Sequence, residues 1–256
     1  MFKVPHFIWL AVCVVLLAMG IYYLLKYKPK LDNVLTICFI VAIISEVVKI
    51  FSSIKMIPHQ NGNYYPYLSK GHLPFHLCSI QIIFISYVKF AKSSKVRDIF
   101  LAFMYPTCLL GAFIALLVPT IFINGTAEAY EPLAFQYFLF HVMLILLGLY
   151  IPLCKEVKIT HKNYFTTIAI LATLGFLSIY LNAALATVDF ESNIYLDVTN
   201  FFFTYSVPIK LPLTEVWHWY LYLTVIISLV LILIGACYTP YFVKYFKNKK
   251  ESLKEL

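Results

Sequence analysis

The chain has 256 residues, of which 62% are hydrophobic and only 12% are charged. A water-soluble domain of this length cannot bury so much apolar surface in one core. The composition therefore excludes a soluble globular protein and indicates an integral membrane protein. The formal net charge of +8 is explained by basic loops at a membrane surface and implies no nucleic acid partner.

Apolar runs long enough to cross a bilayer core of ~30 Å as helices recur along the whole chain. They span residues 7–25, 34–52, 74–90, 99–120, 135–153, 164–185 and 217–236. The sequence thus predicts an all-α, polytopic protein with seven transmembrane helices, placed in the cell membrane. Because no small-residue cleavage site follows the first run, we expect that run to be retained as a helix and not removed as a signal peptide.

Lysine and arginine concentrate in every second loop of this arrangement. The basic loops are residues 26–30, 89–97 and 155–162, and the C-terminal tail is basic as well. The loops between them hold few or no basic residues. Because cytoplasmic loops are enriched in lysine and arginine, the pattern predicts an external N-terminus and a cytoplasmic C-terminus.

No internal repeat or low-complexity linker divides the chain, so we expect a single membrane domain over residues 1–256. Residues 1–30 are expected to form an N-terminal anchor helix that faces lipid, because the apolar run within them has no charged or amide side chain. Residues 31–242 are expected to form a six-helix bundle of catalytic type. Residues 243–256 are expected to form a basic cytoplasmic tail.

A dense group of polar side chains enters the third span at residues 71–81, which read Gly-His-Leu-Pro-Phe-His-Leu-Cys-Ser-Ile-Gln. Pro74 suits the first turn of a helix, so we expect the helix to begin near Leu73 or Pro74 and Cys78 to lie one turn inside. Chemically capable groups inside a membrane span indicate a functional site. The alternative is a polar seam that holds helices together. The candidate groups beside Cys78 are His72, His76, Ser79 and Gln81.

His141 stands alone among apolar residues in the fifth span, so its ring nitrogens need partners inside the protein, and Tyr137 is one candidate. Taken alone, such a histidine is typical of a hydrogen-bonded core residue. Cys78 and His141 each lie about four to six residues inside spans that start on the outer side, which places them at nearly the same depth. The further polar residues expected in this outer layer are Glu46, Asn182, His218 and Trp219.

Glu46 and Lys49 are three residues apart and share one face of the second span. A lone charged side chain at mid-membrane costs roughly 2.5–3.5 kcal/mol on insertion scales, so an ion pair between the two is the favoured interpretation. The alternative is that Glu46 orients a histidine or lines a polar cavity. Trp219 stands at the entrance of a span, where tryptophan is typical of the membrane interface.

The six cysteines fall in or at the edges of apolar spans and show no paired spacing. Neither a disulfide framework nor a metal site is predicted from them. The chain also contains no glycine-rich phosphate loop and no Gly-x-Ser-x-Gly elbow. We therefore expect no metal and no cofactor.

Short motifs in several parts of the chain carry a family resemblance when they are taken together. They are Leu-Pro-Phe-His-Leu-Cys-Ser at 73–79, Phe-Gln-Tyr-Phe-Leu-Phe-His at 135–141, Gly-Leu-Tyr at 148–150, Asn182, Asn-Ile-Tyr-Leu at 193–196 and Trp-His-Trp-Tyr at 217–220. These motifs resemble the bacterial YwaF family and its animal relative, transmembrane protein 164. The resemblance implies a seven-helix protein with a core akin to the androgen-induced lipid hydrolases. For the animal branch it implies a cysteine-dependent acyltransferase acting between phospholipids, with Cys78 as the nucleophile and His141 as the base.

The sequence therefore predicts acyl transfer or lipid-ester hydrolysis through a thioester, with a membrane phospholipid or lysophospholipid as partner. A thiol with a reference pKa of ~8.5 is little ionised at neutral pH, so Cys78 needs a base, and His141 could accept its proton. Gln81 or Asn182 could donate to the oxyanion. The residues with expected supporting roles are His76, Glu46, Tyr137, Trp219 and His218. The alternative is a non-catalytic multi-pass protein with a role in lipid binding, transport or assembly.

Overall fold

The computed structural model describes residues 4–60, 62–123, 125, 127–189, 191–192, 194–206 and 214–252, with the backbone alone at 123 and 195–197. Within these ranges the chain forms eight α-helices, two short 3-10 helices and two antiparallel hairpins. The α-helices are α1 (Val4–Tyr27), α2 (Leu31–Ser53), α3 (Leu77–Phe90), α4 (Lys95–Leu117), α5 (Thr120–Ile123), α6 (Pro132–Leu153), α7 (Lys162–Leu185) and α8 (Val216–Ser252). The 3-10 helices are η1 (Lys70–His72) and η2 (Phe201–Phe203), and the strands are β1 (Lys55–Pro58), β2 (Tyr64–Tyr67), β3 (Thr187–Asp189) and β4 (Ile194–Asp197).

The all-α, polytopic class predicted from the apolar runs is confirmed, but the helices are not equal in length. In the part of the chain that the structure describes, six helical segments are long and apolar enough to cross a membrane: α1, α2, α4 continued through α5 to Phe122, α6, α7 and α8. The third predicted span is α3, which has only 14 residues, about 21 Å at ~1.5 Å per residue against a bilayer core of ~30 Å. The expectation of seven full-length spans is therefore corrected to six long helices and one short apolar helix.

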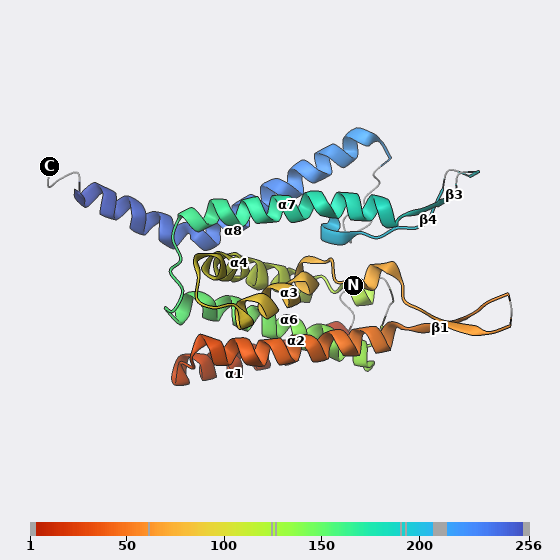
Figure 1. Ribbon diagram of the computed structural model, residues 1–256, viewed down its shortest axis with the longest axis horizontal. Coiled ribbons are helices and arrows are strands. Elements are labelled where there is room, and N and C mark those ends of the chain that lie inside the picture. Colours follow the sequence, from red (N-terminus) through yellow and green to blue (C-terminus); the bar gives the residue numbers. More distant parts are fainter. Residues whose placement is uncertain are drawn as a thin grey trace.

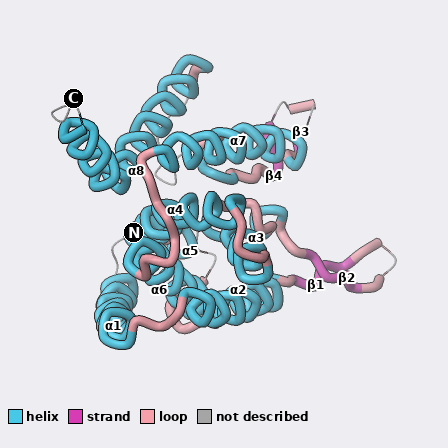
Figure 2. The backbone as a smooth tube through the Cα atoms, turned by 60° about the vertical axis from the view of Figure 1, so that its left-hand side comes forward, coloured by secondary structure: helices cyan, strands magenta, loops and turns pink. Residues whose placement is uncertain are grey.

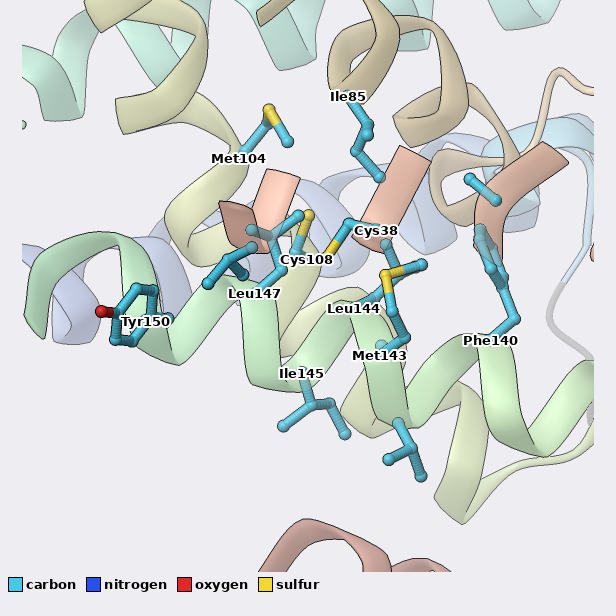
Figure 3. Close-up of a cluster of buried hydrophobic side chains, with 14 of the residues drawn as sticks. Cys38, Ile85, Met104, Cys108, Phe140, Met143, Leu144, Ile145, Leu147 and Tyr150 are labelled. Atoms are coloured by element: carbon cyan, nitrogen blue, oxygen red, sulfur yellow. The ribbon is translucent and has the colours of Figure 1, made fainter. Parts of the chain in front are cut away.

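Four helices, α2, α3, α4 and α6, form a ring in which each helix packs against two neighbours. The neighbouring pairs are α2 with α3, α3 with α4, α4 with α6, and α6 with α2. Consequently α3 and α6 face each other across the ring. Apolar side chains fill its interior, and Figure 3 shows part of this cluster, in which Cys38 of α2, Cys108 of α4 and Leu144 of α6 point into a common core.

Helices α4 and α6 approach each other backbone to backbone at Gly148. A Cβ atom at position 148 would lie 2.7 Å from the backbone nitrogen of Leu109 and 2.9 Å from the carbonyl oxygen of Tyr105. Backbone atoms cannot move aside as a flexible side chain could, so glycine is required at this crossing. Small residues permit such close helix contacts within membranes, where packing replaces the hydrophobic effect as the driving force.

Helices α7 and α8 form a layer on the α4 side of the ring (Figures 1 and 2). Pro106 lies inside α4 and has no N–H to donate to the carbonyl of Ala102. Tyr238 of α8 donates its hydroxyl to this carbonyl at 2.8 Å. Tyr105 of α4 donates in turn to the carbonyl oxygen of Cys237 at 2.9 Å. The break in the α4 hydrogen-bond ladder therefore becomes an attachment point for α8.

Helix α1 packs outside the ring, against α6. Its Trp9 stacks on Phe138 with ring centroids 4.8 Å apart and donates to the carbonyl oxygen of Ala129 at 3.0 Å. His6 lies 3.0 Å from the carbonyl oxygen of Leu116 through Nε2 and is buried. One side of α1 is thus bound to the ring by polar and aromatic contacts. The sequence had predicted only that this helix faces lipid.

Both hairpins project from one end of the helices, and the C-terminal end of α8 lies at the opposite end (Figure 1). Because α2 runs from the basic loop at 26–30 to the hairpin β1–β2, that loop lies away from the hairpins. The basic loop and the hairpins therefore lie at opposite ends of the helices, as the alternation of basic and non-basic loops predicts. The assignment of the hairpin end to the outside stays a prediction.

We expect an impermeant thiol reagent, applied to intact cells, to label a cysteine introduced at Tyr64 in β2 and to spare one introduced at Lys95, where α4 begins. The reason is that the two positions lie at opposite ends of the helices. Mass shift of the purified protein, corrected for labelling of the six native cysteines in the parent, gives the result. The reverse pattern would place the hairpins in the cytoplasm.

The Gly148→Ala substitution is expected to destabilise the protein by about 1–3 kcal/mol, because the new methyl group overlaps the α4 backbone. Gly175→Ala on α7 is the matched control, since nothing lies within 4 Å of a Cβ atom at that position. The control is expected to be neutral or up to about 1 kcal/mol stabilising, because alanine favours helix. Thermal unfolding in one detergent measures both, and equal midpoints would contradict the required close crossing.

Candidate functional site

Cys78 occupies the second position of α3, because the helix begins at Leu77 and not at Leu73 or Pro74 as the sequence indicated. His76 precedes the helix with an extended backbone, φ −73° and ψ 151°. The amide nitrogen of Phe75 donates to the carbonyl oxygen of Leu73 at 2.8 Å, so Pro74, which lies between them, belongs to a turn. The thiol therefore lies at the positive end of the helix dipole instead of one turn inside the helix.

The amides that open α3 have no backbone acceptors. The first backbone hydrogen bond of this helix runs from the amide of Ile80 to the carbonyl of His76, at 2.9 Å. Among the described residues, the N–H groups of Leu77, Cys78 and Ser79 have no hydrogen-bond partner. Such donors at a helix start attract negative charge. The peptide around Cys78 is thus suited to an anionic group next to the thiol.

The Cys78 side chain points toward α4 at Gly111. A Cβ atom at position 111 would lie 3.8 Å from the Cys78 sulfur. The sulfur is partly buried against the apolar cluster of the ring. The Leu77 side chain lies beside it, with Cδ2 3.4 Å from the same Cβ position, so the start of α3 packs against α4 at a residue without a side chain.

His141 lies on α6 with 6% of its surface exposed. Its Nδ1 is 2.6 Å from the carbonyl oxygen of Tyr137, one turn earlier, and the two rings lie 4.3 Å apart. A carbonyl oxygen only accepts, so in the neutral ring Nδ1 carries the proton and Nε2 carries the lone pair. Nε2 has no hydrogen-bond partner among the described residues. The histidine therefore has the tautomer that a general base requires.

Two contacts between the antiparallel helices α4 and α6 show which of their residues lie at the same level. Gly148 meets the backbone of Leu109. Further toward the hairpin end, the Tyr137 hydroxyl donates to the carbonyl oxygen of Ala115 at 2.8 Å. His141 lies between these two contacts on α6, so it is level with the α4 segment that joins them.

Gly111, which contacts Cys78, belongs to that same segment of α4. Cys78 and His141 therefore lie at one level on facing helices of the ring, which agrees with the depth predicted from their positions in the sequence. No hydrogen bond joins the Cys78 sulfur to a His141 nitrogen in the described part of the chain. The two groups thus share a level, and no hydrogen bond between them is formed among the described residues.

Gln81 follows Cys78 by one helical turn and is fully buried. Its amide nitrogen donates to Oγ1 of Thr107 at 3.1 Å, and Thr107 donates to the carbonyl of Phe103 at 2.8 Å. The hydroxyl proton is thus used, so Oγ1 must accept and the orientation of the Gln81 amide is determined. Its Oε1 is then a buried acceptor without a partner in the described part of the chain. The unpaired atom of Gln81 is an acceptor, whereas the expected oxyanion contact needs a donor.

Glu46 forms an ion pair with Lys49, with 2.7 Å between Oε1 and Nζ. The interpretation of these residues as an ion pair on one helix face is confirmed. Both lie near the hairpin end of α2.

Asn182 belongs to a second polar group, between α7 and the segment around η2. Its side-chain oxygen accepts from Oγ1 of Thr199 at 3.0 Å and from the amide of Phe201 at 2.9 Å. Its side-chain nitrogen donates to the carbonyl of Phe201 at 3.1 Å and to Oγ1 of Thr204 at 2.8 Å. This segment uses the full hydrogen-bonding capacity of Asn182. The side-chain N–H groups of Asn182 that were expected to donate to an oxyanion are therefore already used.

Trp219 and His218, at the start of α8, have separate roles. Trp219 donates its indole N–H to the carbonyl of Thr204 at 2.9 Å, so it holds the same segment as Asn182 does. His218 accepts from the amide of Glu215 at 3.2 Å through Nδ1. Trp219 thus fixes a loop in addition to lying at the entrance of a span, and His218 caps its own helix.

Residues 201–204, which we call the strap, cover the approach to α3. Phe201 is fully buried. Its ring lies 5.5 Å from that of Phe75 and 5.0 Å from that of His76, both in edge-on geometry. His76 therefore packs under the strap, two residues before Cys78.

Two successive strap residues, Phe202 and Phe203, have positive φ angles of 55° and 54°. This conformation is costly for a bulky side chain and persists only where the surroundings determine it. Asn182 and Trp219 provide those contacts, and the Tyr222 hydroxyl donates to the carbonyl of Phe203. The strap is therefore held in place by α7 and α8 together.

The polar residues of the predicted outer layer thus form two groups. Cys78 and His141 belong to the ring, whereas Asn182 and Trp219 hold the strap, and His76 lies between the two groups. Sequence reasoning did not include Thr199, Thr204 or Tyr222, which complete the second group. A signal for them was present, because an asparagine in an apolar helix needs partners for several polar atoms and the following loop contains the threonines.

The fold and the site define an all-α, polytopic membrane protein whose helix ring holds a thiol and a histidine at one level. Among known proteins, the model of the TMEM164 family matches residues 1–238 of the chain. The chain belongs to the TMEM164 family. No curated protein and no solved structure matches it. The resemblance to transmembrane protein 164 is thereby confirmed at the level of the family, and the relationships to the YwaF family and to the androgen-induced lipid hydrolases stay predictions.

Asn182→Ala is expected to release the strap, because the substitution leaves buried groups of the strap unpaired at a cost of about 1–3 kcal/mol. Amide hydrogen exchange at Phe201 and its neighbours should become about tenfold faster or more. Thr173→Ala is the control on the same helix, since its exposed hydroxyl bonds only to the carbonyl of Ala169. Unchanged exchange at the strap in the Asn182 variant would show that other contacts hold it.

Proposed function

We propose that the protein transfers fatty acyl chains between lipids, or hydrolyses lipid esters, in the cell membrane, with Cys78 as nucleophile and His141 as base. One observation carries the proposal: a thiol at a helix start and a histidine with an unpartnered, unprotonated Nε2 lie at one level of the ring. The resemblance to transmembrane protein 164 supports it, because that resemblance implies a cysteine-dependent acyltransferase.

The start of α3 favours the reactive form of the thiol. Burial opposes ionisation of Cys78, so a proton acceptor is needed. The positive end of the helix dipole stabilises a thiolate, and His141 can take the proton at Nε2. Because no hydrogen bond joins the two groups among the described residues, substrate binding has to complete this contact, as is common for catalytic hydrogen bonds.

In the first half-reaction, the Cys78 sulfur attacks the carbonyl carbon of a lipid ester while its proton passes to His141. The C–S bond forms, the ester C–O bond breaks, and the leaving lysolipid oxygen takes the proton back from His141. In the second half-reaction, a hydroxyl group of a lysophospholipid or of water attacks the thioester. Its proton passes to His141, the C–S bond breaks, and the thiolate is reprotonated.

The oxyanion of each tetrahedral intermediate needs hydrogen-bond donors near the sulfur. The free N–H groups of Cys78 and Ser79 supply two such donors from the chain that carries the nucleophile. They replace Gln81 and Asn182, whose side chains are engaged elsewhere.

A phospholipid with a tagged acyl chain is expected to label Cys78 through a bond that hydroxylamine cleaves. Cys78→Ala should abolish the label, and Cys108→Ala, at a buried cysteine of the same ring, should leave it intact. His141→Gln should slow labelling by about 10²–10⁴-fold, because the proton acceptor is removed. Mass spectrometry of the purified protein and of the lipids reads out both half-reactions. Lipid binding without any labelled cysteine would support the non-catalytic alternative instead.

A further inference from the structure

Basic side chains gather at the hairpin end of the ring, next to the start of α3. We call Lys49, Lys55 and His72 the basic mouth. Lys49 lies near the end of α2, Lys55 begins β1 directly after that helix, and His72 ends η1. Because η1 packs against α2, the histidine and the lysines belong to one surface. The Lys49 side chain is only 12% exposed, so its charge is held inside this surface and not in bulk water.

The basic mouth has an excess of positive charge. Glu46 neutralises only one lysine, through its ion pair with Lys49. The pKa of His72 is lowered by burial first, then by the charges of Lys49 and Lys55, while Glu46 has the smallest effect, in the opposite direction. The field at His72 is therefore positive although a carboxylate is near. A half-buried positive field of this kind favours an anion.

The basic mouth is adjacent to the proposed nucleophile. Helix α2, which carries Lys49, packs against α3 as well as against η1, and Cys78 is the second residue of α3. Lys70 of η1 is excluded from the mouth, because its ammonium group already makes two hydrogen bonds, to the carbonyl of Leu185 at 2.7 Å and to Oγ1 of Thr187 at 2.9 Å. Lys49 and Lys55 therefore remain as the cations of the mouth.

We infer that the basic mouth binds the phosphate group of a phospholipid, with Lys49 and Lys55 as its cationic ligands and His72 as a hydrogen-bond partner. The inference rests on the proposed function for the place of the reacting ester. A lysine ammonium group has three donors, and the ion pair with Glu46 accounts for one of those on Lys49. Lysine is a common ligand of phosphate, which it binds as a point charge.

The chemistry of a phospholipid matches the order of these groups along the protein. The ester carbonyls of the lipid are a few bonds closer to the acyl chains than the phosphate is. A phosphate held at Lys49 therefore places an ester near the first turn of α3, where Cys78 and the free amides lie. The site should accordingly prefer phosphate-bearing lipids to neutral diacylglycerols.

The test uses purified full-length protein with Cys78→Ala, so that binding is measured without chemistry. Thermal stability is titrated with dioctanoyl phosphatidic acid, with dioctanoyl glycerol and with inorganic phosphate. Glu46→Gln with Lys49→Gln removes the ion pair without leaving a lone buried charge. The matched control is Asp32→Asn with Lys89→Gln, which removes another carboxylate–lysine pair, at 2.8 Å, near the other end of α2.

The parent is expected to bind the phosphatidic acid about tenfold more tightly than the glycerol lipid, as one charge-assisted contact permits. The Glu46/Lys49 variant should lose this preference while its affinity for the glycerol lipid is unchanged, and the Asp32/Lys89 control should keep it. Retention of the preference in the Glu46/Lys49 variant, or equal loss in the control, overturns the inference. Protection by inorganic phosphate at the same concentrations assigns the site to free phosphate and overturns the lipid assignment.

Lys55→Gln provides a second variant that does not disturb the packing, because Lys55 is exposed. It should weaken phosphatidic acid binding about two- to fivefold, and no change would remove Lys55 from the site. The outcome is independent of the thiol chemistry, because Cys78 is absent throughout. Conversely, a protein that labels at Cys78 but shows no preference for phosphate retains the proposed function and loses only this inference.

Discussion

The backbone contact between α4 and α6 at Gly148 is the constraint on which the ring depends. A side chain there would meet backbone atoms of Leu109 and Tyr105, which cannot give way. The contact sets how α4 and α6 are aligned, and that alignment places His141 level with Gly111 and so with Cys78. A glycine well away from the proposed chemistry therefore determines the relative depth of the thiol and the imidazole. The same crossing leaves α3 and α6 facing each other with the interior of the ring between them.

Polar groups among these apolar helices fall into two kinds, because an unpaired polar group is costly in such surroundings. Asn182 and Tyr238 are fully bonded, and each joins helices or holds a loop. By contrast, Nε2 of His141, Oε1 of Gln81 and the first amides of α3 have no partner in the described part of the chain. Groups left unpaired in a native structure are typical of positions that receive a ligand or take part in chemistry.

The approach to α3 has an apolar and a charged side. The strap covers His76 with the ring of Phe201 and is fastened by α7 and α8. On the other side, α2 and η1 present the basic mouth. A lipid has the same two-sided character, with an anionic head and apolar chains. The positive φ angles in the strap show that this cover is maintained against a local backbone preference, which is expected where a loop shapes a site and does not merely connect two helices.

The sequence by itself determined the membrane class, the long helices, the ion pair of Glu46 with Lys49, and the common depth of Cys78 and His141. These features follow from the lengths of apolar runs, from three-residue spacing on a helix and from a constant rise per residue, all of which are local. Only the tertiary structure decided that α3 begins at Leu77, that Gln81 bonds to Thr107, and that Asn182 bonds to the strap. The reason is that a buried polar atom takes its partner from whichever segment packs against it. Helix packing and long loops bring that segment from elsewhere in the chain, where no local pattern records the pairing.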